Sequence, residues 1–139
     1  VKLMILQAPV SDREMAFYLN ASEAAEILQL AQSLPPEQLL PLPWGFCGQP
    51  VAVTAYRGQS LLARGGDDDY FSTDLNREER RLATVSSNPE IQIIFGDADE
   101  CFPYKERADQ YLADLQAACP AITKIHRLPS NHALSGLSQ

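Results

Sequence analysis

A short apolar run that leads directly into an acidic loop constrains the fold of this chain more than any other stretch. Residues 91–95 are mostly isoleucine and phenylalanine and lie between Pro89 and Gly96, a pattern typical of a parallel strand that is covered on both faces. Residues 97–100 then place three carboxylates after that strand. Because ligands and catalytic groups gather at the carboxyl ends of strands in open α/β sheets, these carboxylates are candidates for a functional site.

Two further strands and a crossover helix accompany the central strand. Residues 104–119 carry apolar side chains at helical spacing, and residues 121–128 then have the composition of a strand. Residues 1–6 are also strand-like. A strand, a helix and a strand in succession form a βαβ unit with a right-handed crossover. We therefore predict an α/β fold in which residues 1–6, 91–95 and 121–128 form three adjacent parallel strands.

The segment after the first strand is expected to be helical. Ser11 or Asp12 can cap a short helix that ends near Leu19. Asn20 with Glu23 resembles a capping box that opens a second helix, and a proline pair stops that helix. The apolar stripe along this second helix predicts a face that packs against the core.

A proline-rich stretch follows these helices. Residues 35–50 contain five prolines interleaved with leucines and aromatic residues, which argues against regular elements and is too apolar for a flexible linker. We predict a packed covering loop. Trp44 and Phe46 are then either substrate-binding wall residues under a lid or parts of a hydrophobic plug, and the composition favours neither. Residues 9–55 are expected to form a cap insertion within a single domain of residues 1–139.

An acidic turn follows a short predicted helix at residues 54–64. Three aspartates at residues 67–69 suggest a calcium loop, but Phe71 stands where such a loop needs an oxygen ligand. A solvated acidic turn is therefore the better interpretation. Asn76 and Glu79 resemble another capping box, for a helix whose arginines are expected to face solvent or the acidic turn: Arg77, Arg80 and Arg81.

The charge and the cysteines argue against several classes of function. Eleven Lys and Arg against eighteen Asp and Glu give a net charge of −7, which repels nucleic acid and anionic lipid. Cys47, Cys101 and Cys119 form no C-x-x-C pair, so they indicate neither a disulfide framework nor a zinc site. No apolar run approaches the ~20 residues that span a bilayer. We expect a cytoplasmic protein with no metal, no cofactor, and no nucleic-acid or membrane partner.

A histidine near the end of the chain can lie close to the carboxylates of the acidic loop. His132 follows the strand at residues 121–128, and one crossover helix separates that strand from the carboxylates. This spacing allows a carboxylate to orient an imidazole, as in the second half of a triad in the chain order Ser, Asp, His. An ordinary solvated loop histidine is the alternative. His126 is a poorer candidate because it lies inside the strand.

Five segments that cover most of the chain carry a family resemblance. They are ILQAPVSDRE at residues 5–14, TAYR at 54–57, GDDDYFSTDL at 66–75, GDADECFP at 96–103 and NHALS at 131–135. With these segments the chain resembles the carboxyl-terminal half of α/β-hydrolases, and in particular a largely uncharacterised fungal and plant family that includes siderophore (fusarinine-type) esterases. The resemblance implies a partial α/β-hydrolase fold with strands equivalent to the sixth to eighth, a helical cap, Asp99 as the triad acid and His132 as the triad histidine.

The chain departs from the family at the nucleophile. It contains no G-x-S-x-G elbow, and in the segment that begins at Gly58, Leu62 replaces the second glycine, so Ser60 is not a substitute. The resemblance implies that the elbow and the oxyanion loop lie upstream of residue 1. We therefore expect a carboxyl-terminal portion of a serine esterase that is inactive alone, with a small-molecule ester as the substrate of the whole protein.

Three further expectations follow from the missing elbow and from the acidic loop. The first strand should expose an edge that pairs with a missing amino-terminal half or with a second copy of the chain. A non-catalytic remnant or interaction protein is the alternative function. A weaker alternative takes Asp97-x-Asp99 as the paired carboxylates of a metal-dependent phosphoryl or glycosyl transfer site.

Overall fold

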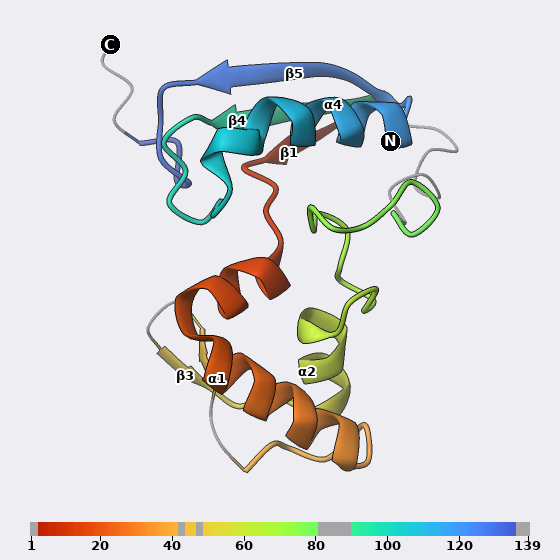
Figure 1. Cartoon of the computed structure of the whole chain (residues 1–139), viewed down its shortest axis with the longest axis vertical. Helices are drawn as coiled ribbons and strands as arrows, with labels where there is room; N and C mark the ends of the chain where they lie inside the picture. Colours follow the sequence, from red (N-terminus) through yellow and green to blue (C-terminus); the bar gives the residue numbers. More distant parts are fainter. Residues whose placement is uncertain (1–2, 42–43, 47–48, 81–89, 136–139) are drawn as a thin grey trace. The chain divides into compact units, whose positions relative to one another are not determined.

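The computed structural model describes residues 3–41, 44–46, 49–80 and 90–135. They belong to two compact units (Figure 1). The first, which we call the sheet unit, comprises Val1–Ser11 and Tyr70–Gln139, and the second, the helical unit, comprises Asp12–Asp69. Most of the predicted cap insertion at residues 9–55 falls within the helical unit. Its role as a cap stays a prediction.

Three parallel strands form the sheet of the sheet unit. They are β1 (Leu3–Gln7), β4 (Glu90–Gly96) and β5 (Ile122–Leu128), in the order β1-β4-β5. Leu3 pairs with Glu90 at one end, and Gly96 pairs with Leu128 at the other. The predicted three adjacent parallel strands are confirmed, although residues 1–2 of the first strand lie outside the described part.

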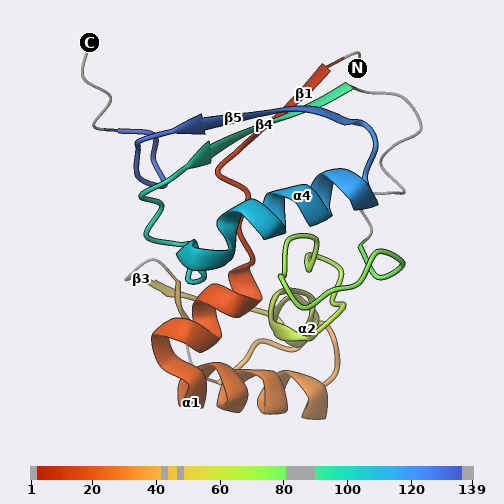
Figure 2. The ribbon, with the colours of Figure 1, turned by 45° about the horizontal axis from the view of Figure 1, so that its top comes forward.

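The α4 helix covers one face of this sheet (Figure 2). It spans Ala108–Ala118 and follows a short 3-10 helix, η1 (Lys105–Arg107). Phe95 of β4 meets Phe102 edge-on at a ring separation of 5.3 Å, and Phe102 lies 5.0 Å from the ring of Tyr111 on α4. The apolar side chains whose spacing predicted the crossover helix therefore pack into the core. That core also includes Ile91, Ile93, Leu112, Leu115 and Ile122.

The opposite face of the sheet is open within the sheet unit. Burial alternates along β4, where Ile93 is fully buried and Ile94 is only half-buried, and Ile5 of β1 is 57% exposed. A hollow of about 240 Å³ lies over this face, lined by Ile5, Gln92, Ile94, His126 and Leu128. The prediction that the central strand is covered on both faces is wrong for the described residues of this unit, because no helix among them packs on the second face.

The helical unit contains two helices and a short hairpin. The α1 helix (Asp12–Ser33) is broken at Asn20, whose φ of −153° and ψ of 85° are not helical. The Asn20 side chain accepts a hydrogen bond from the Glu23 backbone N–H at 3.3 Å, so the predicted cap is present. Thr54 caps the second helix, α2 (Ala55–Leu62), in the same way by accepting from Arg57 N at 3.2 Å.

The proline-rich stretch does contain regular structure. Strands β2 (Trp44–Phe46) and β3 (Gln49–Val51) pair in an antiparallel hairpin, with Pro50 opposite Gly45. The prediction of no regular element here is therefore wrong. In a two-stranded sheet each strand is an edge, and an edge strand tolerates proline because one side of it needs no N–H donor.

The acidic turn is only partly solvated. Asp67 accepts from the Tyr56 hydroxyl at 2.7 Å, whereas the Asp69 carboxylate is fully buried and accepts from Arg13 Nε at 3.1 Å. The predicted solvated turn is wrong for Asp69, because its cation comes from α1, remote in the sequence.

The capping box at Asn76 is present. Asn76 N donates to Glu79 Oε2 at 2.9 Å, and Glu79 N donates to Asn76 Oδ1 at 3.0 Å. Arg80 is buried, at 3% exposure, and lies over the Tyr111 ring, so the alternative in which it faces solvent is wrong. Residues 77–79 form a turn and not the predicted helix, and the rest of that predicted helix, including Arg81, lies outside the described residues.

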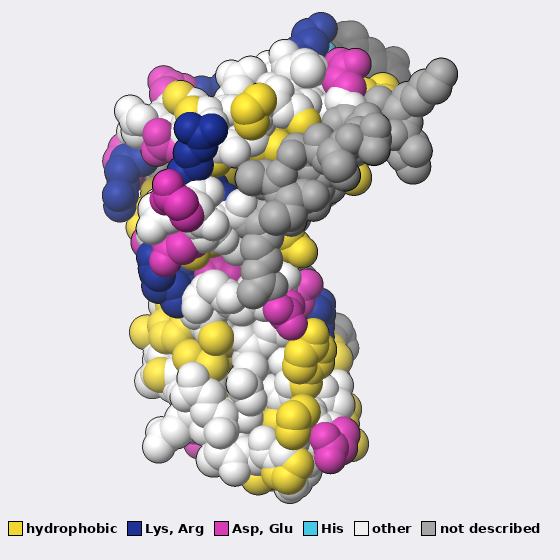
Figure 3. Space-filling model, turned by 90° about the vertical axis from the view of Figure 1, so that its right-hand side faces the viewer, with side chains coloured by type: hydrophobic (Ala, Val, Ile, Leu, Met, Phe, Trp, Pro, Cys, Tyr) yellow, Lys and Arg dark blue, Asp and Glu magenta, His cyan; other side chains and the backbone are white. Residues whose placement is uncertain are grey.

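The surface charges and the hydropathy of the helices bear on possible partners. On the face drawn in Figure 3, basic and acidic side chains lie among one another in the upper part, and hydrophobic side chains are exposed between them. Among the residues that the structure describes, no helix is both long and apolar enough to cross a membrane.

Candidate active site

The loops that follow β4 and β5 form the candidate site. The strands end side by side, and two backbone hydrogen bonds extend their pairing into the loops. Asp97 N donates to Leu128 O at 2.8 Å, and Ala98 N donates to Ser130 O at 3.0 Å. The acidic loop and the histidine loop are therefore held against each other by their main chains as well as by their side chains.

Gly96 permits this close approach. A Cβ atom at this position would lie 2.5 Å from Ser130 O and 2.9 Å from Asn131 O. Real Cβ atoms do not approach backbone oxygens so closely, so the histidine loop can lie here only because the residue has no side chain.

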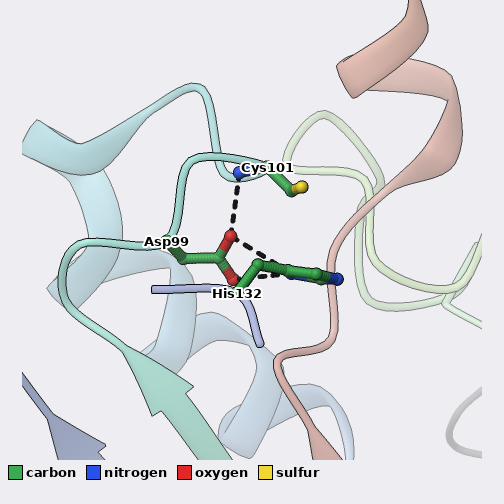
Figure 4. Close-up of side chains that lie close together, drawn as sticks. All are labelled: Asp99, Cys101 and His132. Atoms are coloured by element: carbon green, nitrogen blue, oxygen red, sulfur yellow. Dashed lines mark hydrogen bonds and ion pairs between the residues drawn. The ribbon is translucent and has the colours of Figure 1, made fainter. Parts of the chain in front are cut away.

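Asp99 and His132 meet between these loops (Figure 4). His132 Nδ1 lies 3.1 Å from both carboxylate oxygens of Asp99. Asp99 is 1% exposed and accepts a hydrogen bond from Cys101 N at 2.8 Å, whereas the His132 side chain is 39% exposed. A fixed, buried carboxylate thus faces one nitrogen of an imidazole whose ring is still accessible. This arrangement suits an acid that orients a general base.

Glu100 holds the backbone of the histidine loop. Its Oε2 accepts from His132 N at 3.0 Å. This hydrogen bond, together with one from the backbone N–H of Glu100 itself, lowers the pKa of the Glu100 carboxyl below its usual value. Asn131 closes the loop by accepting from Ser135 N at 2.8 Å. The sequence does not predict this contact between Glu100 and the histidine loop, because it joins two loops that are far apart in the chain.

The other candidates lie apart from this pair. Asp97 accepts from Arg127 Nε at 2.6 Å on the surface, so it does not share a partner with Asp99 as a metal-binding pair of carboxylates would. His126 Nε2 lies 3.2 Å from Gln92 Oε1 on the open face of the sheet. Ser60 is buried within α2 and donates to Asp68. Within the acidic loop, the carboxylate of Asp99 therefore contacts the His132 imidazole, whereas that of Glu100 contacts the His132 backbone.

The two predicted substrate-binding residues stay a prediction. The backbones of Trp44 and Phe46 belong to β2 in the helical unit. Their side chains lie outside the described part of the chain.

Cys101 lies beside the pair of Asp99 and His132, although the spacing of the cysteines in the sequence predicts no metal site. This half-buried residue follows Asp99 by two positions, and its Sγ belongs to a cluster in which one ligand atom each from Asp99, Cys101 and His132 lies within 4.8 Å of the others. The spacing Asp99-x-Cys101 was the available signal, but His132 is far from it in sequence and only the fold brings it near.

Comparisons with known proteins agree with this description. The structure is similar to that of the siderophore hydrolase EstB from Aspergillus fumigatus, with a TM-score of 0.66 and 23% sequence identity over 96% of this chain and 51% of that one. The similarity, with the three parallel strands and their connecting helix, identifies a partial α/β-hydrolase fold. The chain belongs to the family described as "Protein of unknown function (DUF1749)", whose sequence model matches residues 1–137. Curated protein sequences give no match.

These findings confirm the predicted resemblance and fold class. The chain spans about half the length of the similar hydrolase.

Proposed function

We propose that this chain supplies the acid and the histidine of an esterase-type serine hydrolase. The observation that carries the proposal is the contact of His132 Nδ1 with both oxygens of the buried Asp99, at 3.1 Å, at the carboxyl ends of two parallel strands. The fold supports it, because in open α/β sheets this edge is where catalytic groups collect. The sequence has no G-x-S-x-G elbow, so the nucleophile and the oxyanion donors come from outside residues 1–139.

The two residues have distinct roles in this mechanism. With Nδ1 protonated and donating to Asp99, the Nε2 atom of His132 has a lone pair with which to take the proton of a serine hydroxyl. The carboxylate holds the ring in that tautomer and stabilises the imidazolium that forms. His132 then returns the proton to the leaving alcohol. The accessible ring of His132 and the buried carboxylate of Asp99 suit this division of work.

The substrate in this proposal is a small carboxylic ester. The printed name of the similar structure, a siderophore hydrolase, supports a hydrolytic reaction without fixing the acyl or alcohol group. Trp44 and Phe46 are proposed as wall residues of the substrate pocket. The reaction requires no metal, because the histidine activates the nucleophile.

We propose further that the outer edge of β1 pairs with a strand from an upstream part of a longer polypeptide. The sheet order leaves β1 at an edge, and Leu3 and Ile5 are 44% and 57% exposed. An exposed edge with apolar side chains favours pairing. The similar hydrolase is matched over only 51% of its own length, which supports a longer polypeptide as the source of the pairing strand. Dimerisation of the 139-residue chain through β1 would instead favour a second copy.

The test compares the two histidines in the polypeptide that the complete gene encodes. We expect hydrolysis of a chromogenic ester that survives EDTA, labelling by a serine-directed fluorophosphonate, and loss of kcat by orders of magnitude in His132→Ala. His126→Ala is the matched control and should retain activity.

Equal activity in His132→Ala, or loss of activity in EDTA, contradicts the assignment. A protein that hydrolyses no ester and takes up no fluorophosphonate supports the non-catalytic alternative.

A further inference from the structure

The side chains of Asp99, Cys101 and His132 form a cluster with the composition of a metal site. Each offers one ligand atom, and the three atoms lie within 4.8 Å of one another. Figure 4 shows the carboxylate and the imidazole side by side, with the sulfur of Cys101 nearby. Two ligands come from the loop after β4 and one from the loop after β5. We propose that this cluster, which we call the DCH cluster, binds Zn²⁺.

The ligand set selects the class of metal. A thiolate and an imidazole suit Zn²⁺ and similar borderline or soft ions, whereas Ca²⁺ and Mg²⁺ take oxygen ligands almost exclusively. Three protein ligands with water in the fourth position form a common tetrahedral zinc arrangement. This inference goes beyond the proposed function, because a serine hydrolase site needs the carboxylate and the imidazole but has no use for the thiol.

The geometry allows the cluster to close around an ion. Zinc–ligand bonds of about 2.0–2.3 Å place neighbouring tetrahedral ligands roughly 3.3–3.7 Å apart. The 3.1 Å between Asp99 and His132 Nδ1 is close to that spacing, and the largest separation in the cluster, within 4.8 Å, must shrink by about 1 Å. Asp99 is held rigidly, at 1% exposure, while Cys101 is half-buried and His132 is 39% exposed. The two more exposed ligands can therefore move toward the fixed one.

Binding releases a proton and blocks the hydrolase pair. The Cys101 thiol loses its proton to solvent as the Zn–S bond forms, so affinity rises with pH. Zinc also engages the carboxylate and the ring that would orient and deprotonate the nucleophile. If the proposed function holds, Zn²⁺ is then a reversible inhibitor that EDTA removes.

The experiment titrates the reduced 139-residue protein with Co²⁺, a spectroscopic substitute for Zn²⁺. We expect a thiolate-to-cobalt charge-transfer band in the near ultraviolet that saturates at one equivalent and disappears when Zn²⁺ is added. Cys101→Ser should abolish the band and weaken Zn²⁺ binding at least about ten-fold by calorimetry, since even outer partners of metal ligands contribute that much. His132→Asn should weaken binding similarly.

The chain offers matched controls for both variants. Cys119→Ala removes a thiol that is buried in the core of the sheet unit, and His126→Asn removes the other histidine; both should retain the band. A band that persists in Cys101→Ser, no band in the parent protein, or unchanged Zn²⁺ affinity in both site variants overturns the proposal. Because the readout is metal binding, the result is independent of whether the hydrolase proposal stands.

Discussion

Replacing Gly96 by alanine tests whether the two site loops are packed as closely as the structure shows. The new Cβ would lie 2.5 Å from Ser130 O, whereas ordinary contacts begin at 3.4 Å, so the histidine loop must retreat by about 0.9 Å. Overpacking of this kind costs about 1–3 kcal/mol. The retreat also weakens the hydrogen bond from Ala98 N to Ser130 O, which contributes about 1 kcal/mol.

The expected total for Gly96→Ala is about 2–4 kcal/mol, or a fall in Tm of roughly 8–16 °C at about 4 °C per kcal/mol for a chain of this size. Thermal unfolding by circular dichroism measures the fall, and NMR spectra of the His132 ring report the displaced loop. Gly65→Ala is the control, because Gly65 has a φ of +71° but no atom within 4 Å of the added Cβ. It should lower Tm while the His132 signals stay in place. An unchanged Tm and unchanged His132 signals in Gly96→Ala would refute the close packing.

Three further predictions concern stability and exchange. Because the pKa of Glu100 is lowered from its ordinary 4.5 in the folded protein, its ionised form contributes stability above that value, and the contribution disappears as the pH falls through the lowered folded pKa. Glu100→Gln should therefore have a lower Tm than the parent protein at pH 7 and the same Tm in strong acid. A lower Tm of the variant in strong acid as well would count against the contact of Glu100 with His132. Arg13→Ala should cost about 3–5 kcal/mol in a urea titration, because it removes a cation that pairs with the buried Asp69 carboxylate, whereas exposed Arg57→Ala should cost under about 1 kcal/mol; equal losses would contradict the burial. In the monomeric chain, amide hydrogens of β1 should exchange faster than those of β4, since β1 is an edge strand, and equal protection would show that the edge is paired.

The regular elements were predictable where local chemistry decides them. Buried isoleucines between Pro89 and Gly96 define β4, and the caps at Asn20 and Asn76 form as their side chains predict. The prolines of residues 35–50 predict no regular element, yet proline is excluded only from a central strand and not from a two-stranded hairpin such as the one that contains Pro50. Coverage of both faces of β4 could not be read from its apolar run, since burial depends on which other elements the sheet meets.

The site was predictable only in part because its contacts join distant segments. The choice of Asp99 over Asp97 came from the family resemblance, and spacing alone allowed either. The burial of Asp69 depends on Arg13, 56 residues away, and no local pattern reports that pairing. The sequence does not predict the cluster around Cys101, because His132 approaches this cysteine only through the parallel pairing of β4 and β5.

The comparison of Asp99→Asn with Asp97→Asn in the polypeptide that the complete gene encodes tests the central claim most directly. Asn at 99 can still accept at one oxygen but favours the wrong imidazole tautomer, so kcat for ester hydrolysis should fall by about 10⁴. Asp97 pairs with Arg127 at the surface, so Asp97→Asn should change kcat by less than about three-fold. Equal kcat in Asp99→Asn and the parent enzyme, or a larger loss in Asp97→Asn, would contradict the assignment of Asp99 and His132 as the acid and base of this site.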